Sequence, residues 1–371
     1  MRRECGPGLG GAEAHCANVC AWLTKMGHNV TVVADKSLLP GLLFSRAPVW
    51  GRGSIFKNLS FFLNAGQVLK AGNFKVSYGL SRVAPVDVLR ISDPLHAAWL
   101  DLGYRNSTKF RSLRPRHRLL LWMEAKAIRE AKAIVTNSQL VKDQVQHYYS
   151  TDAEKVTVIY NGVDLKRFRP MTQKDRVLAK KTMGISDNAT VFVFAGSDLR
   201  RKGLSQLLSA FARFREQPFI LLVAGSMGNR DLKKKIEEMG LNQNIKWLGY
   251  VKDLERLYAL ADLFVLPTHY DPFANTTLEA MACGTPALTT RQNGAAEVVE
   301  QVARWLVVER PCHRNITEAL EAFAALSTEK RRLLDEKARR VAQKFTWQKH
   351  IEELITMLAR HSIPITTVTE V

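Results

Sequence analysis

The 371-residue chain lacks several features that mark whole classes of protein. It has no run of eighteen apolar residues, the length that a membrane-spanning helix needs. Its first residues, MRRECGPGLGG, have no apolar core of the kind that a signal peptide carries. Its five cysteines are odd in number and scattered, without zinc-ligand spacing, which favours a reducing compartment over a disulfide framework. The sequence therefore predicts a cytoplasmic protein without a metal site.

Acidic residues are scarce. Lysine and arginine number 54 against 35 aspartates and glutamates, and the net charge is +19. Such a balance indicates an anionic partner, namely phosphate groups, nucleic acid or a membrane surface. Zinc-finger spacing and the aromatic signature of RNA-binding domains are both missing, so we predict no nucleic-acid partner.

Short β-branched and apolar runs alternate with amphipathic helical stretches, which is typical of parallel sheets in an α/β protein. The chain is long enough for two domains, and a linker-like stretch with turn residues, a proline and charges lies at 161–175. We therefore predict two doubly wound, Rossmann-like domains facing a cleft, with ligands at the carboxyl ends of the strands. The predicted strands are 30–34, 133–138, 156–162, 191–196, 219–225, 245–250, 263–268 and 286–290.

The most informative stretch is HYDPFANTTLEAMACGTP, residues 269–286. Asn275 is expected to cap a helix that Gly284 helps to end. The free N–H groups at a helix start attract phosphate, and carboxylates accept hydrogen bonds from sugar hydroxyls. Asp271 and Glu279, on either side of that helix start, therefore suit a nucleotide sugar. The alternative is a surface helix with an ordinary aspartate and glutamate.

A second stretch, VFVFAGSDLRRKGL (191–204), follows a buried strand with a basic turn. Arg201 and Lys202 could clamp a diphosphate, the arginine through two N–H groups and the lysine as a point charge. The alternative is a solvated basic turn. The stretch is not a P-loop, because the required spacing of glycines, lysine and serine or threonine is absent.

Two weaker stretches lie in the first half of the chain. Gly10 and Gly11 precede a helical stretch, where glycine lets the backbone approach a ligand closely. Asp93 and His96, in DVLRISDPLHAAWL (87–100), could line a cleft. For this pair a helix-capping aspartate and a partly buried histidine are the favoured interpretation.

Residues 103–126, GYRNSTKFRSLRPRHRLLLWMEAK, form a strongly basic segment. From Arg105 to Arg118 it contains six lysines and arginines, no acid, and is followed by LLLWM. Basic groups beside leucine and tryptophan suit an anionic membrane surface. The alternative is a solvated helix on a basic protein.

Taken together, these motifs resemble glycosyltransferase family 4, retaining enzymes of the GT-B fold. The family's order and spacing are met by GGAE near the start, YNGVDLKRFRP, RRKG and DPFANTTLEAMACGTP. The last of these looks like the family's pair of glutamates eight positions apart, with aspartate at the first position. Within the family, the chain is most similar to bacterial glucosyltransferases of the lipopolysaccharide core, which also carry a basic membrane-associating segment in the first domain.

The resemblance implies a role for each matching residue and a division into 1–165, an acceptor-side domain completed by a crossing helix at 345–371, and 166–344, a nucleotide-sugar-binding domain. Glu279 would hold the ribose hydroxyls, and Arg201 and Lys202 would neutralise the diphosphate. The donor sugar and phosphate would be held by Asp271 and by the amides of Phe273, Ala274 and Asn275. Gly10 and Gly11 would approach the diphosphate, and Asp93 and His96 would be catalytic candidates.

The resemblance further implies a metal-independent hexosyltransferase on the inner face of the cytoplasmic membrane. It would need no cofactor besides its nucleotide-sugar donor. It would move a hexose, glucose in the first instance, from UDP to a heptose of a lipid-linked lipopolysaccharide core. Two alternatives are another family 4 activity, such as mannosyl transfer to a lipid or polysaccharide, and an inactive membrane-binding paralogue.

Family members begin with a β-strand ahead of the glycine loop. Here only MRREC precedes GPGLGG, which is short for a central strand. We therefore expect the first domain to lack its opening strand, and we suspect that Met1 is not the natural start. An absent central strand would leave sheet edges unpaired.

Overall fold

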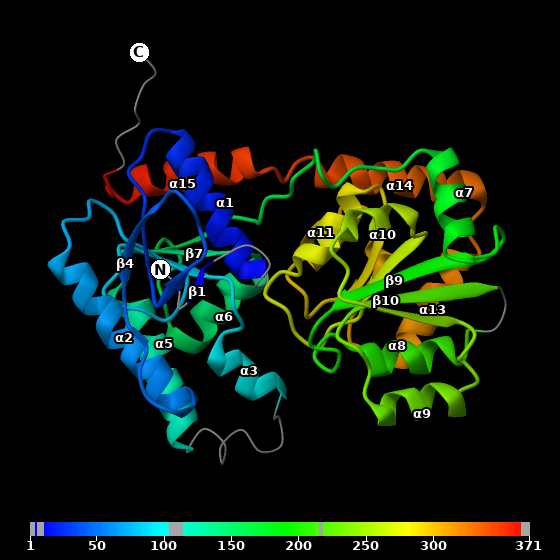
Figure 1. The fold of residues 1–371 in the computed structure, drawn as a ribbon, viewed down its shortest axis with the longest axis horizontal. Coiled ribbons are helices and arrows are strands. Elements are labelled where there is room, and N and C mark those ends of the chain that lie inside the picture. The colour runs from blue at the N-terminus through cyan, green and yellow to red at the C-terminus, as the bar shows by residue number, and fades with distance from the viewer. Residues whose placement is uncertain (1–3, 6–10, 104–113, 215–217, 365–371) are drawn as a thin grey trace. The chain divides into compact units, whose positions relative to one another are not determined.

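A computed structural model gives the fold and describes residues 4–5, 11–103, 114–214 and 218–364. Contacts divide the chain into two compact units. Unit 1 comprises Met1–Gly162 together with Trp347–Val371, and unit 2 comprises Val163–Thr346. Figure 1 shows that strands form the middle of each unit and helices cover them.

The main sheet of unit 1 is parallel, with strand order β5-β6-β7-β8. All four residues of β6 and of β7 are buried, as expected for strands covered on both faces. Two further parallel pairs stand apart from this sheet, β2 with β4 and β1 with β3. The strands are β1 (Glu4–Cys5), β2 (Thr31–Ala34), β3 (Lys36–Ser37), β4 (Leu43–Arg46), β5 (Tyr78–Gly79), β6 (Val88–Ile91), β7 (Ala133–Thr136) and β8 (Val156–Val158).

The last helix of the described chain completes the core of unit 1. In α15 (Trp347–Arg360), Leu354, Met357 and Leu358 are buried against Val88 of β6 and Ala133 of β7. These apolar residues recur every three to four positions, so one face of the helix covers the sheet. The other helices of unit 1 are α1 (Gly11–Lys25), α2 (Gly53–Ala71), α3 (His96–Gly103), α5 (Pro115–Glu130) and α6 (Gln139–Tyr149).

Unit 2 contains a six-stranded parallel sheet with the order β11-β10-β9-β12-β13-β14. The order reverses direction between β9 and β12, and the crevice beyond the carboxyl ends of such a strand pair is where doubly wound sheets bind ligands. The strands are β9 (Thr190–Gly196), β10 (Phe219–Gly225), β11 (Ile245–Gly249), β12 (Leu263–Leu266), β13 (Ala287–Thr290) and β14 (Val307–Val308).

Helices cover both faces of this sheet. Figure 1 shows α8 and α13 on one face and α11 and α14 on the other, and each pair packs together. The helices of unit 2 are α7 (Gln173–Thr182), α8 (Leu204–Phe211), α9 (Arg230–Glu238), α10 (Leu254–Leu260), α11 (Asn275–Ala282), α12 (Ala296–Val299), α13 (His313–Ala324) and α14 (Thr328–Ala342), with a 3₁₀ turn at Arg304–Leu306.

The predicted α/β class with parallel sheets is confirmed, and each of the eight predicted runs contains a strand. The sequence analysis missed β6, because its pattern VLRI has an arginine in the middle. Arg90 is nevertheless only 1% exposed, and its guanidinium donates to Asn161 Oδ1 at 2.5 Å. Among the residues that the structure describes, no helix is both long and apolar enough to cross a membrane.

Candidate functional site

The turn after β9 is the first part of the site. Gly203, at φ +81°, ends this turn and caps α8. A Cβ atom added there would lie 1.9 Å from the Pro267 carbonyl oxygen, so only glycine fits against the end of β12. This close approach holds Arg201 and Lys202 beside the loop that follows β12.

That loop is fastened to the basic turn through backbone groups. The carbonyl oxygen of Arg201 accepts hydrogen bonds from the Thr268 hydroxyl at 2.9 Å and from the His269 N–H at 2.8 Å. In the opposite direction, Arg201 Nη1 donates to the Tyr270 carbonyl at 2.9 Å. The carboxyl ends of β9 and β12 therefore form one connected structure.

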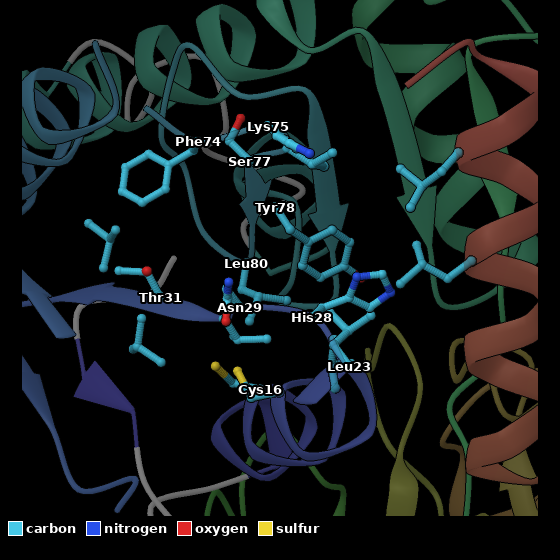
Figure 2. Close-up of a pocket in the computed structure, with 18 of the residues that line it drawn as sticks. Cys16, Leu23, His28, Asn29, Thr31, Phe74, Lys75, Ser77, Tyr78 and Leu80 are labelled. Atoms are coloured by element: carbon cyan, nitrogen blue, oxygen red, sulfur yellow. The ribbon is translucent and has the colours of Figure 1, made fainter. Parts of the chain in front are cut away.

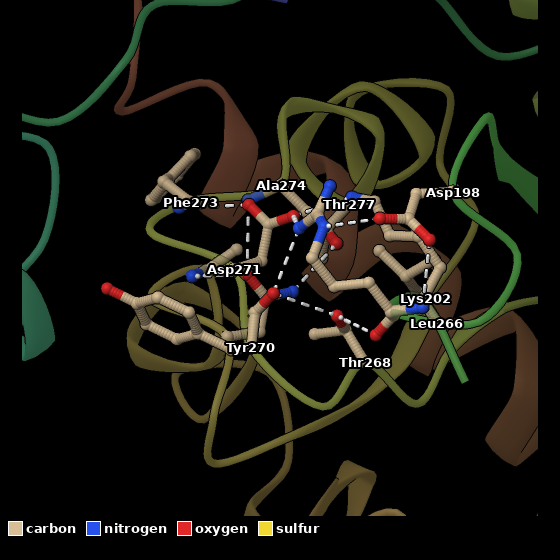
Figure 3. Close-up of polar contacts among 12 residues, drawn as sticks. Asp198, Lys202, Leu266, Thr268, Tyr270, Asp271, Phe273, Ala274 and Thr277 are labelled. Carbon is tan, nitrogen blue, oxygen red and sulfur yellow. Dashed lines mark hydrogen bonds and ion pairs between the residues drawn. The ribbon is translucent and has the colours of Figure 1, made fainter. Parts of the chain in front are cut away.

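Asp271 lies at the centre of these contacts (Figure 3). Its Oδ2 accepts from Arg201 Nη1 at 2.8 Å and from Lys202 Nζ at 2.6 Å. Its Oδ1 accepts from the Phe273 N–H at 3.2 Å. The structure thus brings together three residues that the sequence analysis selected from two separate motifs.

The charges in this cluster are mutually stabilising. Burial by itself raises the pKa of the Asp271 carboxyl, but Lys202 and Arg201 outweigh burial and hold that pKa below its ordinary value. Asp271 is therefore ionised at neutral pH. Arg201 also contacts Asp198, at 3.4 Å, but that carboxylate is half exposed and its attraction is screened by water.

Asn293, which the sequence analysis did not select, joins the site loop to the end of β13. Its side chain is 1% exposed, and its Oδ1 accepts from the N–H groups of Ala274 and Ala295 at 3.0 and 3.1 Å. Its Nδ2 donates to the Thr289 hydroxyl at 3.0 Å and reaches the Thr277 hydroxyl at 3.4 Å. The only local signal was the dipeptide Asn-Gly after a predicted strand, which is typical of any turn.

The helix expected through this motif is α11, but its start differs from the prediction. Ala274 is the N-cap residue, its side chain makes no capping hydrogen bond, and Asn275 is the first helical residue. Asn275 therefore lies inside the helix and is not its cap. The N–H of Ala274 itself donates to Asn293 in a neighbouring loop. Gly284, at φ +81°, follows the end of the helix as predicted. The Thr276 hydroxyl is buried and has no hydrogen-bond partner within the described chain.

Glu279 lies one turn into α11 and is half-buried. Burial raises the pKa of its carboxyl to about 7, although Arg167 and the Tyr258 hydroxyl both act to lower it. Arg167 is itself paired with Glu255 at 2.9 Å. Glu279 is therefore a carboxyl that changes charge near neutral pH.

The remaining candidates lie in unit 1. His96 begins α3, its N–H donates to the buried Glu124 carboxylate at 2.8 Å, and its Nε2 lies 3.0 Å from Nδ1 of His117. Burial, helped by Arg82, lowers the pKa of His96 to about 4, so its imidazole is neutral at physiological pH. Asp93 is half-buried and follows β6.

The other predicted positions are only partly described. Gly11 is the first residue of α1, whereas Gly10 lies outside the described residues. Most of the first half of the basic segment 103–126 lies outside them too, and its second half belongs to α5. Within the described ranges, no group of three or more His, Cys, Asp and Glu side chains is placed to hold a metal ion.

Two family models match the chain. The model described as Glycosyltransferase Family 4 matches residues 9–167, and the model described as Glycosyl transferases group 1 matches residues 175–341. Together they account for most of the sequence.

Among curated proteins, D-inositol 3-phosphate glycosyltransferase from Saccharomonospora viridis is 30% identical over 246 residues. The alignment covers 62% of this chain and 56% of that protein, so the chain spans little more than half of the relative's length.

Among solved structures, WaaG, a glycosyltransferase involved in lipopolysaccharide biosynthesis, superposes with a TM-score of 0.82 at 20% identity. The superposition covers 96% of this chain and 99% of WaaG. HepE from Anabaena, solved in complex with UDP and glucose, superposes with a TM-score of 0.75 at 20% identity, over 97% of this chain and 100% of HepE. These similarities show the fold.

Proposed function

Because this chain belongs to glycosyltransferase family 4 and has the GT-B fold, we propose that it is a retaining hexosyltransferase that uses a UDP-sugar. The observation that carries the proposal is the Arg201–Lys202–Asp271 cluster where the strand order of unit 2 reverses. It joins two cations that can receive a diphosphate to a carboxylate that can accept hydrogen bonds from a sugar. HepE, a protein of the same fold, binds UDP and glucose in its crystal.

In the proposed reaction the bond between the anomeric carbon and the diphosphate breaks, and the acceptor oxygen bonds to that carbon from the same face. The leaving phosphate oxygen takes the acceptor's proton. Negative charge grows on the diphosphate as it leaves, so Arg201 and Lys202 stabilise the transition state more than the ground state. Both cations are already held in place by Asp271, which reduces the reorganisation needed during reaction.

The other residues take supporting roles in this proposal. Glu279 accepts hydrogen bonds from the ribose hydroxyls, and Asp271 and the start of α11 hold the donor sugar and phosphate. Gly10 and Gly11 approach the diphosphate, and Asp93 and His96 are the catalytic candidates. A neutral His96 can accept a proton or a hydrogen bond but brings no positive charge to the site.

For the acceptor we propose the heptose of a lipid-linked lipopolysaccharide core, reached from an anionic membrane surface. In support, α5 carries Arg116, Arg118 and Trp122 exposed on unit 1. A second candidate acceptor is inositol 3-phosphate, favoured by the names of the curated relatives. Both acceptors suit a protein of net charge +19, since both are anionic.

The experiment that tests the donor is thermal unfolding of the protein with UDP, ADP, GDP and their glucose conjugates. A ligand that binds only the folded state raises the melting temperature, and we expect UDP and UDP-glucose alone to do so. Transfer from UDP-glucose to core heptose or to inositol 3-phosphate, with EDTA present, then identifies the acceptor. A folded protein that none of the nucleotides stabilises would contradict the proposal and favour an inactive paralogue.

We expect UDP-glucose to bind more weakly as the pH falls through 7. The pKa of Glu279 is about 7, so its carboxylate is ten times less populated at pH 6 than at pH 8, and only the carboxylate accepts hydrogen bonds through both oxygens. The dissociation constant measured by calorimetry should therefore be about tenfold higher at pH 6 than at pH 8. In Glu279→Gln this pH dependence should disappear; an unchanged profile would rule out the ribose role.

A further inference from the structure

Two cavities lie away from the Arg201–Lys202–Asp271 cluster, one in each unit, and their linings differ in charge. The cavity in unit 1 has a volume of about 560 Å³ and is lined mainly by apolar side chains of α1, β2 and the segment leading into β5 (Figure 2). Lys75 is the one lysine, arginine or acid among the described residues that line it. The cavity in unit 2, of about 510 Å³, is lined by three arginines, one aspartate and one glutamate besides smaller side chains. We call this second cavity the α14 pocket.

The α14 pocket lies at the end of α11, whereas the Arg201–Lys202–Asp271 cluster adjoins the loop before that helix. Its other walls come from the segment that leads into α7, from the end of α10 and from α14, all neighbours within unit 2 (Figure 1). Helix α11 has eight residues and is therefore about 12 Å long, and none of the three cluster residues lines the pocket. A ligand in the α14 pocket would thus be separate from the sugar donor.

The three arginines of the pocket differ in how their charge is balanced. Arg176 donates to the Asp262 carboxylate at 2.6 Å, so this cation is paired. Arg339 donates to three backbone carbonyl oxygens and to no carboxylate of the described chain. Arg340 is exposed and makes no ion pair with any residue that the structure describes. Two positive charges at this pocket are therefore left without a carboxylate from the described residues.

Asp335 is the acid of the pocket that the fold does not use. It is half-buried on α14 and makes no hydrogen bond or ion pair within the described part of the chain, whereas its neighbour Glu336 is paired with Arg332. Burial raises the pKa of the Asp335 carboxyl to about 7, although Arg176 acts to lower it. About half of these carboxyls are thus protonated at pH 7. Such a group suits a hydroxyl, which both donates and accepts, better than an ammonium cation.

We propose that the α14 pocket binds a small phosphorylated sugar, with the phosphate held by Arg340 beside Arg339 and a sugar hydroxyl bonded to Asp335. A phosphate matches the excess of positive charge, because a guanidinium forms two parallel hydrogen bonds with phosphate oxygens. The hydroxyl supplies the hydrogen bond that Asp335 lacks. A volume of about 510 Å³ lies within the range of pockets that take small ligands. The proposal does not depend on the transferase activity.

The test measures the binding of glucose 6-phosphate to the full chain by calorimetry, with glucose and inorganic phosphate as comparison ligands. We expect glucose 6-phosphate to bind about tenfold more tightly than either, since each of the others lacks one of the two contacts. If inorganic phosphate binds as tightly as glucose 6-phosphate, no hydroxyl is recognised and the proposal is wrong. A chain that does not bind glucose 6-phosphate would overturn it too.

Three lysine and arginine variants locate the phosphate. Arg340→Met should raise the dissociation constant for glucose 6-phosphate about tenfold. Lys337→Met removes the same charge from an exposed position of α14 outside the pocket and should leave that constant unchanged. Lys202→Met should leave it unchanged as well. If Lys202→Met weakens binding and Arg340→Met does not, the phosphate binds at the donor cluster and the proposal is overturned.

Asp335→Leu separates binding from folding. The substitution removes a half-buried carboxyl without a hydrogen bond, so we expect an equal or higher melting temperature together with about fivefold weaker binding of glucose 6-phosphate. A lower melting temperature would show that Asp335 stabilises the fold of unit 2, and would contradict its assignment to a ligand. Donor binding and sugar transfer are measured separately, so these results do not affect the test of the proposed function.

Discussion

Replacing Lys202 by methionine is expected to lower kcat/KM for sugar transfer by about a hundredfold to a thousandfold, the usual cost of removing one preorganised charge from a transition state. Lys202 Nζ lies 2.6 Å from Asp271, and its side chain is 11% exposed, so water cannot replace the ammonium fully. Methionine keeps the length and most of the apolar stem. The measurement is the initial rate with UDP-glucose and the acceptor identified by the transfer assay.

Two controls make this result specific. Lys233→Met, on exposed α9, changes the net charge by the same amount away from the site and should leave the rate unchanged. Lys202→Arg keeps the positive charge but spreads it over a planar guanidinium. This variant should therefore recover part of the rate. If Lys202→Met and Lys233→Met transfer sugar at the same rate, Lys202 has no role in stabilising the leaving diphosphate.

Replacing Asp271 by asparagine is expected to lower the free energy of unfolding by about 3 kcal/mol. The reason is that Arg201 and Lys202 then lose the buried carboxylate that they share. The amide oxygen of asparagine can still accept from the Phe273 N–H, so the change removes charge rather than shape. Urea unfolding at pH 7 measures the loss. Saturating UDP should reduce it, since the diphosphate returns negative charge to the pair.

The pH dependence and a neighbouring carboxylate check this interpretation. The Asp271 pKa is depressed in the folded state, so its contribution is fully present above the ordinary aspartate pKa near 3.9 and is lost as the pH falls through the folded pKa. The difference between wild type and variant should therefore shrink in acid. Asp198→Asn removes the other partner of Arg201, a half-exposed one, and should cost less than about 1 kcal/mol. If Asp271→Asn and Asp198→Asn lower the free energy of unfolding equally, burial does not make the Asp271 ion pairs stronger than the Asp198 one.

Much of unit 2 could be predicted because its signals are local. The strand VFVFAG, the basic turn after it and the end of α11 just before Gly284 all lie where periodicity and turn residues place them. The pairing of Asp271 with Lys202 was not predicted: the sequence analysis expected ligands at the carboxyl ends of the strands and gave the two residues separate roles toward the donor.

What could not be predicted depends on contacts between distant residues. Asn293 accepts a hydrogen bond from the N–H of Ala274, nineteen positions away. Nothing in the residues around Asn293 distinguishes it from an ordinary turn asparagine. The start of α11 was misplaced by one residue, because the N-cap position is held by Ala274, a residue whose side chain cannot cap. The strand β6 was hidden by Arg90, whose burial depends on an asparagine 71 positions further on.

The hydrogen bonds that join the turn after β9 to the loop after β12 bear on how the donor preference of this protein could be re-engineered. Neither loop can be exchanged alone, because the Arg201 carbonyl needs Thr268 and His269, and Gly203 needs the exact path of Pro267. A graft from a relative with another sugar preference must therefore carry both segments, together with the asparagine that supports the second one. The unit of exchange between such enzymes is a matched set of three loops rather than a single specificity loop.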